Sequence, residues 1–257
     1  MSARGSAATQ AAYVLHHYDW SESSLIVELF TRESGRVAVA AKGAKRPTSN
    51  LRAVLLPFQR IQVGFGRGPR DAATASDIRN LRGAEWAGGA PMAGGADALM
   101  SGFYLNELLL KLLARDDPHP ELWDAYAATL PHLGGTDEAG ALRTFELVLL
   151  ADTGHLPDLA CDSATQQAVE PDRRYVLRPQ TGLVAASDDE TAMGGAHFMA
   201  LQAALAPRDM AALRAACQPC HAALRRQLRS WLAYHLGGAP LRTREVARGL
   251  QPLLNPS

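Results

Sequence analysis

A basic loop near the N-terminus holds the residues whose types and spacing best suit the binding of a ligand. Residues 42–52 carry four cationic side chains and no acid. Lysine ammonium and arginine guanidinium groups are the donors that proteins use to bind phosphate oxygens. The loop therefore predicts a phosphate contact, and a polyphosphate such as nucleic acid is the expected ligand. The alternative is a solvated basic surface that only improves solubility.

The cysteines form a second pattern with chemical potential. Cys217, Cys220 and His221 match the C-x-x-C-H arrangement that attaches c-type haem. Such proteins are exported, and no export signal is recognised in this sequence. With Cys161 the same residues could supply four zinc ligands, but zinc sites usually use two close pairs and only one pair is present. Because Cys217 and Cys220 lie at helical spacing with apolar neighbours, we expect both thiols to be buried, without metal or cofactor.

No catalytic constellation is recognised, so an enzyme is not expected. Serine, histidine and aspartate occur, but the nucleophile-elbow, H-E-x-x-H and phosphate-loop motifs do not. Residues 64–68 read G-F-G-R-G, yet they do not open a helix as a dinucleotide-binding turn would. A cysteine-based or metal-dependent activity around Cys217, Cys220 and His221 stays an alternative, and it predicts bound metal in the purified protein.

The charge is unevenly distributed along a chain of 257 residues whose net charge is zero. Residues 1–85 hold 12 Lys or Arg and 7 Asp or Glu, a balance of +5, so the remaining 14 and 19 give −5. Positive potential is therefore expected in the N-terminal third. A second basic run includes Arg225, Arg226 and Arg229, which could face DNA or form the solvated side of an amphipathic helix.

The elements that must position the basic loop are predicted to be short β-strands. Ile61, Val63 and Phe65 alternate with other residues at the period of a half-buried strand, and turn residues separate five such runs. Five short strands predict a small closed barrel. The expected strands are 12–16, 24–30, 36–42, 59–65 and 73–78, with a second basic turn between the last two.

A helical domain is expected after a connector at residues 86–96, which is rich in glycine, alanine and proline. The fold class is therefore α+β, with a barrel domain at 1–85 and a mainly α-helical domain at 97–257. No run of about 18 apolar residues is present, so no membrane span is expected and the protein is placed in the cytoplasm. Helices are predicted around 105–113 and over 121–130, 141–151, 196–206 and 209–236, with a hairpin in an irregular insertion at 155–190.

The predicted nucleic-acid-binding site combines cations with aromatic side chains of the barrel. Bases of a single strand stack on exposed aromatic rings while cations hold the phosphates, although most of these rings are expected in the core. The predicted phosphate contacts are Arg36, Lys42, Lys45, Arg46 and Arg67, with Arg52 and Arg70 at the margin, and the interleaved aromatics are Trp20, Phe30, Phe58 and Phe65.

Several motifs of this sequence resemble those of the RecO family of bacterial recombination mediators, and they occur in the same order. The resemblance covers almost the whole chain. Its motifs are residues 13–16, 20–25, 29–37, 41–44, 56–58 and 66–68 in the barrel, and 104–108, 142–147 and 236–245 in the helical part.

This resemblance implies a barrel of the oligonucleotide-binding (OB) type followed by a helical domain, in a nucleoid-associated protein of DNA repair and homologous recombination. It implies binding of single- and double-stranded DNA and annealing of complementary strands coated by single-strand binding protein. It also implies cooperation with RecR in the RecF pathway, without catalysis. A protein-interaction adaptor that does not bind DNA is the alternative.

Two residues are interpreted through the resemblance. Arg143 is placed at a receptor for the acidic C-terminal tail of single-strand binding protein, although an exposed surface arginine fits the sequence as well. Some relatives hold zinc with four cysteines in the insertion. Here only Cys161 lies in that segment, so a zinc site of that kind is not expected.

Overall fold

The structure is a computed structural model that describes residues 9–66, 78–89, 94–186, 188–189, 191–246 and 249. The chain divides into two compact units. The first unit contains Met1–Met92 and Leu105–Asp124, and the second contains Ala93–Tyr104 and Ala125–Ser257. Residues 105–124 thus belong with the N-terminal unit, and the domain boundaries at residues 85 and 97 stay a prediction.

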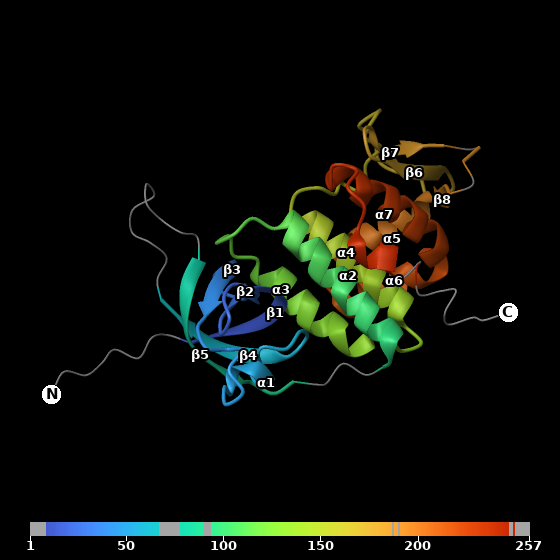
Figure 1. The fold of residues 1–257 in the computed structure, drawn as a ribbon. Helices are drawn as coiled ribbons and strands as arrows, with labels where there is room; N and C mark the ends of the chain where they lie inside the picture. The colour runs from blue at the N-terminus through green and yellow to red at the C-terminus, as the bar shows by residue number, and fades with distance from the viewer. Residues whose placement is uncertain are drawn as a thin grey trace, which may run out of the picture. The chain divides into compact units, whose positions relative to one another are not determined.

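The first unit is built on a closed barrel with the strand order β1-β2-β3-β5-β4 (Figure 1). Neighbouring strands are antiparallel except β3 and β5, which are parallel. This topology confirms the predicted OB-type barrel and the α+β class. The strands are β1 (Gln10–Asp19), β2 (Leu25–Thr31), β3 (Gly35–Ala41), β4 (Arg60–Phe65) and β5 (Ile78–Trp86), and a short helix α1 (Leu51–Val54) precedes β4.

The fifth strand differs from the prediction at 73–78. It runs over Ile78–Trp86, and residues 73–77 lie outside the described residues. A register shift opposite Gly64 and Phe65 places an extra residue in β5, so its two core-facing side chains, Leu81 and Ala84, are three positions apart. A bulge of this kind hides the period of two on which sequence recognition of a strand depends.

Small aliphatic side chains fill the barrel. On β2 and β3, alternate residues such as Val27, Leu29, Val37 and Val39 point inward and are at most 1% exposed. Burial of this apolar surface is the main stabilising contribution to the barrel.

Residues 105–124 cover the outer face of β1 and β2. They include the second half of α2 (Ala96–Leu112) and the start of α3 (Pro120–Thr129). The Trp123 indole Nε1 donates to the Phe30 carbonyl at 3.1 Å, and its ring lies 5.3 Å from that of Tyr13. Asn106 Nδ2 donates to the Leu15 carbonyl at 3.0 Å. Tyr13, Leu15 and Phe30 are therefore buried although they are not part of the core cluster inside the barrel.

Gly35, at the start of β3, allows the backbone of the covering segment to approach this strand closely. Its φ is +67°, and a Cβ there would lie 1.7 Å from the Asp117 carbonyl oxygen. The Asp116 amide donates to the Arg36 carbonyl at 2.9 Å, so residues 115–117 run directly against the beginning of β3. Only glycine combines this backbone conformation with so close an approach.

The second unit is mainly helical. Helix α6 (Met210–Cys217) packs against α4 (Glu138–Asp152) and α5 (Gly195–Leu205). Helix α7 (His221–His235) packs against α4, and η1 (Leu130–His132) follows α3. Among the described residues, every helix is too short or too polar to span a bilayer.

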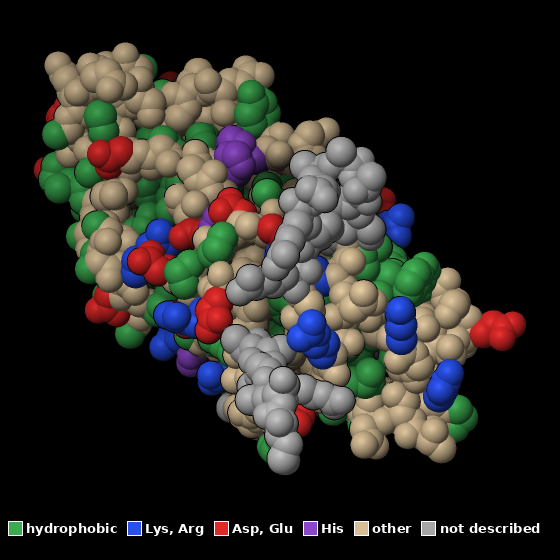
Figure 2. Space-filling model, turned by 90° about the vertical axis from the view of Figure 1, so that its left-hand side faces the viewer, with side chains coloured by type: hydrophobic (Ala, Val, Ile, Leu, Met, Phe, Trp, Pro, Cys, Tyr) green, Lys and Arg blue, Asp and Glu red, His purple; other side chains and the backbone are tan. Residues whose placement is uncertain are grey.

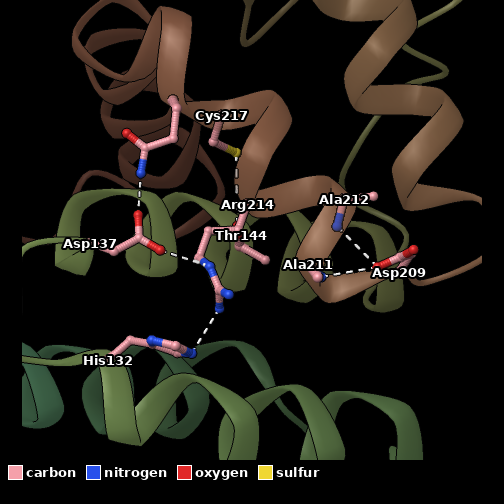
Figure 3. A network of polar contacts seen from close by, with 9 residues as sticks. His132, Asp137, Thr144, Asp209, Ala211, Ala212, Arg214 and Cys217 are labelled. Carbon is pink, nitrogen blue, oxygen red and sulfur yellow. Dashed lines mark hydrogen bonds and ion pairs between the residues drawn. The ribbon is translucent and has the colours of Figure 1, made fainter.

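The predicted continuous helix at 209–236 is wrong. A 3-10 turn, η2 (Gln218–Cys220), separates α6 from α7. Pro219 lies in this turn, where it cannot donate the backbone hydrogen bond that an uninterrupted α-helix requires. Asp209 caps the start of α6, because its Oδ1 accepts from the Ala211 and Ala212 amides at 3.0 Å each (Figure 3).

The predicted hairpin in the insertion is confirmed. Strands β6 (Arg174–Arg178) and β7 (Gly182–Ala185) pair antiparallel, and β8 (Met193–Gly194) completes the sheet. Gln227 of α7 anchors this sheet: it accepts from the Leu177 amide and donates to the Thr191 carbonyl, both at 2.7 Å.

The loop between α4 and β6 contains a buried acid. Asp162 is 4% exposed, and its carboxylate accepts hydrogen bonds from the backbone amides of Ala164 and Thr165.

Candidate nucleic-acid interface

A hollow of about 380 Å³ opens on the barrel where the β1–β2 turn meets the loop after β3. In the antiparallel register of β2 and β3, Leu25 at the start of β2 lies opposite Ala41 at the end of β3. The turn that precedes Leu25 and the loop that follows Ala41 therefore lie side by side. The volume is within the usual range of small-molecule sites, which begins at about 300 Å³. The lining residues are Trp20, Ser21, Ser23, Ser24, Lys42, Gly43 and Arg46.

Hydrogen bonds hold the two rims of this hollow together. The Lys45 amide donates to the Ser23 carbonyl at 3.0 Å, and its Nζ donates to the Ser21 carbonyl at 3.2 Å. Lys45 Nζ also lies 3.1 Å from the Asp19 carboxylate. The Gly43 amide donates to Ser24 Oγ at 3.4 Å. Lys45, predicted as a phosphate contact, therefore links the rims and is already partly neutralised.

Lys42 and Arg46 differ from Lys45 in their surroundings. Both side chains are exposed and line the hollow, and among the residues that the structure describes neither forms an ion pair. Their charges are not neutralised within this part of the protein, so they are available to an anionic ligand.

Arg36 lies in a structural contact instead. Its side chain is only 17% exposed, Nη1 donates to the Leu110 carbonyl, and Nε lies 4.0 Å from the Glu28 carboxylate. Arg115 also binds Glu28. These contacts join β2, β3 and the covering segment, and they argue against a role for Arg36 in DNA contact.

The remaining predicted barrel residues are distributed as follows. Arg67 and Arg70 lie outside the described residues, so their place relative to the hollow stays a prediction. Arg52 is exposed on α1. Phe30 is buried, whereas Trp20 is 55% exposed in the hollow.

The covering segment also limits which face of the barrel can bind a ligand. OB domains bind oligonucleotides on the face of their second and third strands and with the flanking loops. Here residues 105–124 occupy the outer side of that region through contacts to Phe30, Arg36 and Glu28. The end of the barrel at the β1–β2 turn is left accessible, and it is there that the hollow lies.

Arg143 is buried on α4 and paired with Glu146. Its Nε donates to Glu146 Oε2 at 2.7 Å and its Nη2 to Oε1 at 2.6 Å. Tyr104 donates to the same carboxylate at 2.5 Å, and the Arg244 guanidinium lies 5.3 Å from the Tyr104 ring centre. Burial raises the pKa of Tyr104, which keeps its hydroxyl a donor. The interpretation of Arg143 as an exposed surface arginine is wrong, since it is 6% exposed.

The expectation that both thiols are buried is confirmed. Cys217 is 0% and Cys220 8% exposed. Thr144 Oγ1 lies 3.9 Å from the Cys217 sulfur (Figure 3), and burial raises the pKa of this thiol to about 12. A thiol that stays protonated is a poor nucleophile and metal ligand. Within the described ranges, no three His, Cys, Asp or Glu side chains come together in a way that could hold a metal ion.

Part of the C-terminal basic run, which extends from Arg208 to Arg248, is also engaged in structural contacts. Arg214 Nε lies 2.7 Å from Asp137, and Nη1 lies 2.8 Å from His132 Nε2 (Figure 3). By contrast, Arg225, Arg226 and Arg229 are exposed on α7. Figure 2 shows lysine and arginine side chains dispersed over one face, some of them beside acidic side chains. Location within a basic run therefore does not by itself make an arginine available to a ligand.

Both parts of the chain match models of known protein families. Residues 6–81 match "Recombination protein O N terminal", and residues 95–245 match "Recombination protein O C terminal". A DNA repair protein RecO from Delftia acidovorans is 51% identical, over 95% of this chain and 96% of its own length. Those from Polaromonas naphthalenivorans and Variovorax paradoxus are 49% and 47% identical, over 95% and 98% of this chain and 97% and 100% of their own lengths.

Proposed function

This chain belongs to the RecO family of DNA repair proteins, and on that premise we propose that its barrel binds DNA at the hollow lined by Lys42 and Arg46. The observation that carries this proposal is that Lys42 and Arg46 are exposed at one end of the barrel and form no ion pair with any residue that the structure describes. Membership of the family assigns the chain to DNA repair and recombination. The proposed action is binding of single and double strands, without catalysis by side chains.

Phosphate neutralisation is the physical basis of the proposed binding. Each phosphate that a lysine or arginine neutralises releases condensed counterions from DNA, and the affinity therefore decreases as salt increases. Contacts of this kind carry no sequence information, which suits a protein that must act on any damaged strand.

The proposed role includes annealing of complementary strands coated by single-strand binding protein, in cooperation with RecR. Annealing requires one protein, or one assembly, to hold two strands. The exposed arginines 225, 226 and 229 on α7 offer a second basic surface in addition to the hollow. An amphipathic helix with a solvated side explains these arginines as well.

Binding of the tail of single-strand binding protein is proposed for the surroundings of Arg143. The proposal comes from the family resemblance, and the structure adds a condition to it. Because Glu146 already satisfies the Arg143 guanidinium, an incoming carboxylate has to compete with that buried partner.

Lys42→Ala and Arg46→Ala test the DNA-binding proposal. Each variant should weaken binding of single- and double-stranded DNA and lower the slope of log affinity against log salt by about 0.7 to 0.9. Arg82→Ala is the matched control, since Arg82 is an exposed arginine of β5 that does not line the hollow. Unchanged affinity and slope in both test variants would reject this site. A wild-type protein that binds neither form of DNA would favour the adaptor that does not bind DNA.

A further inference from the structure

Trp20 and Trp86 are the two exposed tryptophans of the barrel, and of these two Trp20 lines the hollow. Trp123 and Trp231 are 3% and 4% exposed and donate hydrogen bonds to backbone carbonyls, as buried indoles usually do. Trp20 is 55% exposed, although it follows directly after a strand of the barrel. The described contacts in the barrel thus leave a large part of the Trp20 side chain uncovered.

The backbone around Trp20 is held in place. Its amide and that of Ser21 both donate to the Ser24 carbonyl, at 3.2 and 3.3 Å. The links from Lys45 to Ser21 and Ser23 fix the same turn against the loop after β3. The turn that carries the exposed indole is therefore held in a fixed position and forms one wall of the hollow.

The other wall of the hollow carries Lys42 and Arg46. An aromatic side chain and two cations without an ion-pair partner among the described residues thus line one hollow of about 380 Å³. Proteins that bind single-stranded nucleic acid combine these two elements, since bases stack on the ring while cations hold the phosphates. In a duplex the bases are paired and stacked on each other, so only the phosphates are available to such a site.

We propose that Trp20 is a stacking platform for one unpaired base of a single DNA strand, and that it makes the hollow selective for single strands over duplex. This inference rests on the proposed DNA-binding function and adds a specificity residue to it. Lys42 and Arg46 contribute affinity for both forms of DNA, and Trp20 contributes affinity for unpaired bases alone.

The test compares Trp20→Ala, Trp20→Phe and Trp20→Leu in the full chain. The probes are a labelled oligothymidine and a duplex with the same number of phosphates. Trp20→Ala should weaken oligothymidine binding by roughly 5- to 150-fold, the range found for loss of one stacked base, and change duplex binding less than twofold. Trp20→Phe should keep most of the affinity, while Trp20→Leu, which retains apolar bulk without a ring, should lose it.

Trp86→Ala is the matched control, because Trp86 is a barrel tryptophan that is 66% exposed and does not line the hollow. It should leave both affinities unchanged. A thermal unfolding transition shared with the wild type establishes that each variant is folded, and the Phe and Leu variants decide the matter if the Ala variant unfolds.

The outcomes separate this inference from the proposed function. If the Lys42→Ala and Arg46→Ala variants bind both probes more weakly while Trp20→Ala weakens neither, or weakens both equally, the stacking role is wrong and the phosphate site stands. Equal loss in Trp20→Phe and Trp20→Leu also overturns the stacking role. If the two cation variants bind both probes as the wild type does, the interface itself is wrong and the Trp20 proposal is rejected with it.

Discussion

At the scale of single residues, the partner of a charge decides what the charge can do. Lys42 and Lys45 are three positions apart, yet Lys45 is bound to Asp19 and backbone carbonyls, whereas Lys42 is exposed without an ion pair in the described part of the chain. Arg36 and Arg143 are likewise engaged with Glu28 and Glu146. A charge with a fixed structural partner contributes little to ligand binding, because the ligand must displace that partner.

Arg143→Ala should destabilise the protein by about 3–5 kcal/mol, because it leaves the buried Glu146 carboxylate without its cation. Urea unfolding measures this change. The double variant Arg143→Met with Glu146→Gln removes both charges and keeps an acceptor for Tyr104, so it should recover much of the lost stability. Binding of the single-strand binding protein tail is then measured on the double variant. Wild-type affinity there would contradict the proposed receptor at Arg143.

At the scale of elements, the barrel is completed by a segment that is distant in sequence. The strands form the barrel wall, but the outer side of β1 and β2 is covered by parts of α2 and α3. Close approach of residues 115–117 to β3 depends on Gly35, for which no other residue can substitute without displacement of the Asp117 backbone. Within the described residues of the first unit, this arrangement leaves the end of the barrel at the β1–β2 turn uncovered, and the hollow lies there.

Gly35→Ala tests whether this close approach matters for stability. Gly35 and Gly88 both have positive φ, +67° and +75°, but a Cβ at Gly88 meets no atom within 4 Å. Gly88→Ala should therefore cost only the roughly 1–2 kcal/mol of a left-handed alanine. Gly35→Ala should cost about 3 kcal/mol or more, because backbone atoms must also move. Equal losses of unfolding free energy in the two variants would show that the contact with Asp117 is unimportant.

At the scale of the whole molecule, each compact unit is assembled from two separate stretches of chain. The first unit needs residues 105–124 in addition to its N-terminal stretch, and the second needs residues 93–104. Charge is separated in a simpler way, since residues 1–85 carry +5 and the remainder −5. The positive charge therefore lies in one continuous segment of the sequence, whereas each compact unit combines two separate segments.

A fragment of residues 1–124 should fold more stably than one of residues 1–85. The shorter fragment exposes Tyr13, Leu15 and Phe30, whose outer surfaces residues 105–124 bury in the intact protein. We expect the shorter fragment to aggregate or to lack a cooperative thermal transition by circular dichroism, and the longer one to show such a transition. A cooperative transition at the same temperature in both fragments would mean that the barrel is independent of its covering segment.

The sequence by itself determined the α+β class, the barrel, most helix positions and the burial of Cys217 and Cys220, because these follow from local periodicity and spacing. It could not locate β5, whose pattern is broken by a bulge, and it missed the break at Pro219 between α6 and α7. It indicated several cations and aromatics for the site. Only the tertiary structure decided that Lys42, Arg46 and Trp20 share one hollow while Arg36 and Arg143 are paired with buried acids. Availability of a side chain depends on neighbours that are distant in sequence, and local patterns carry no information about them.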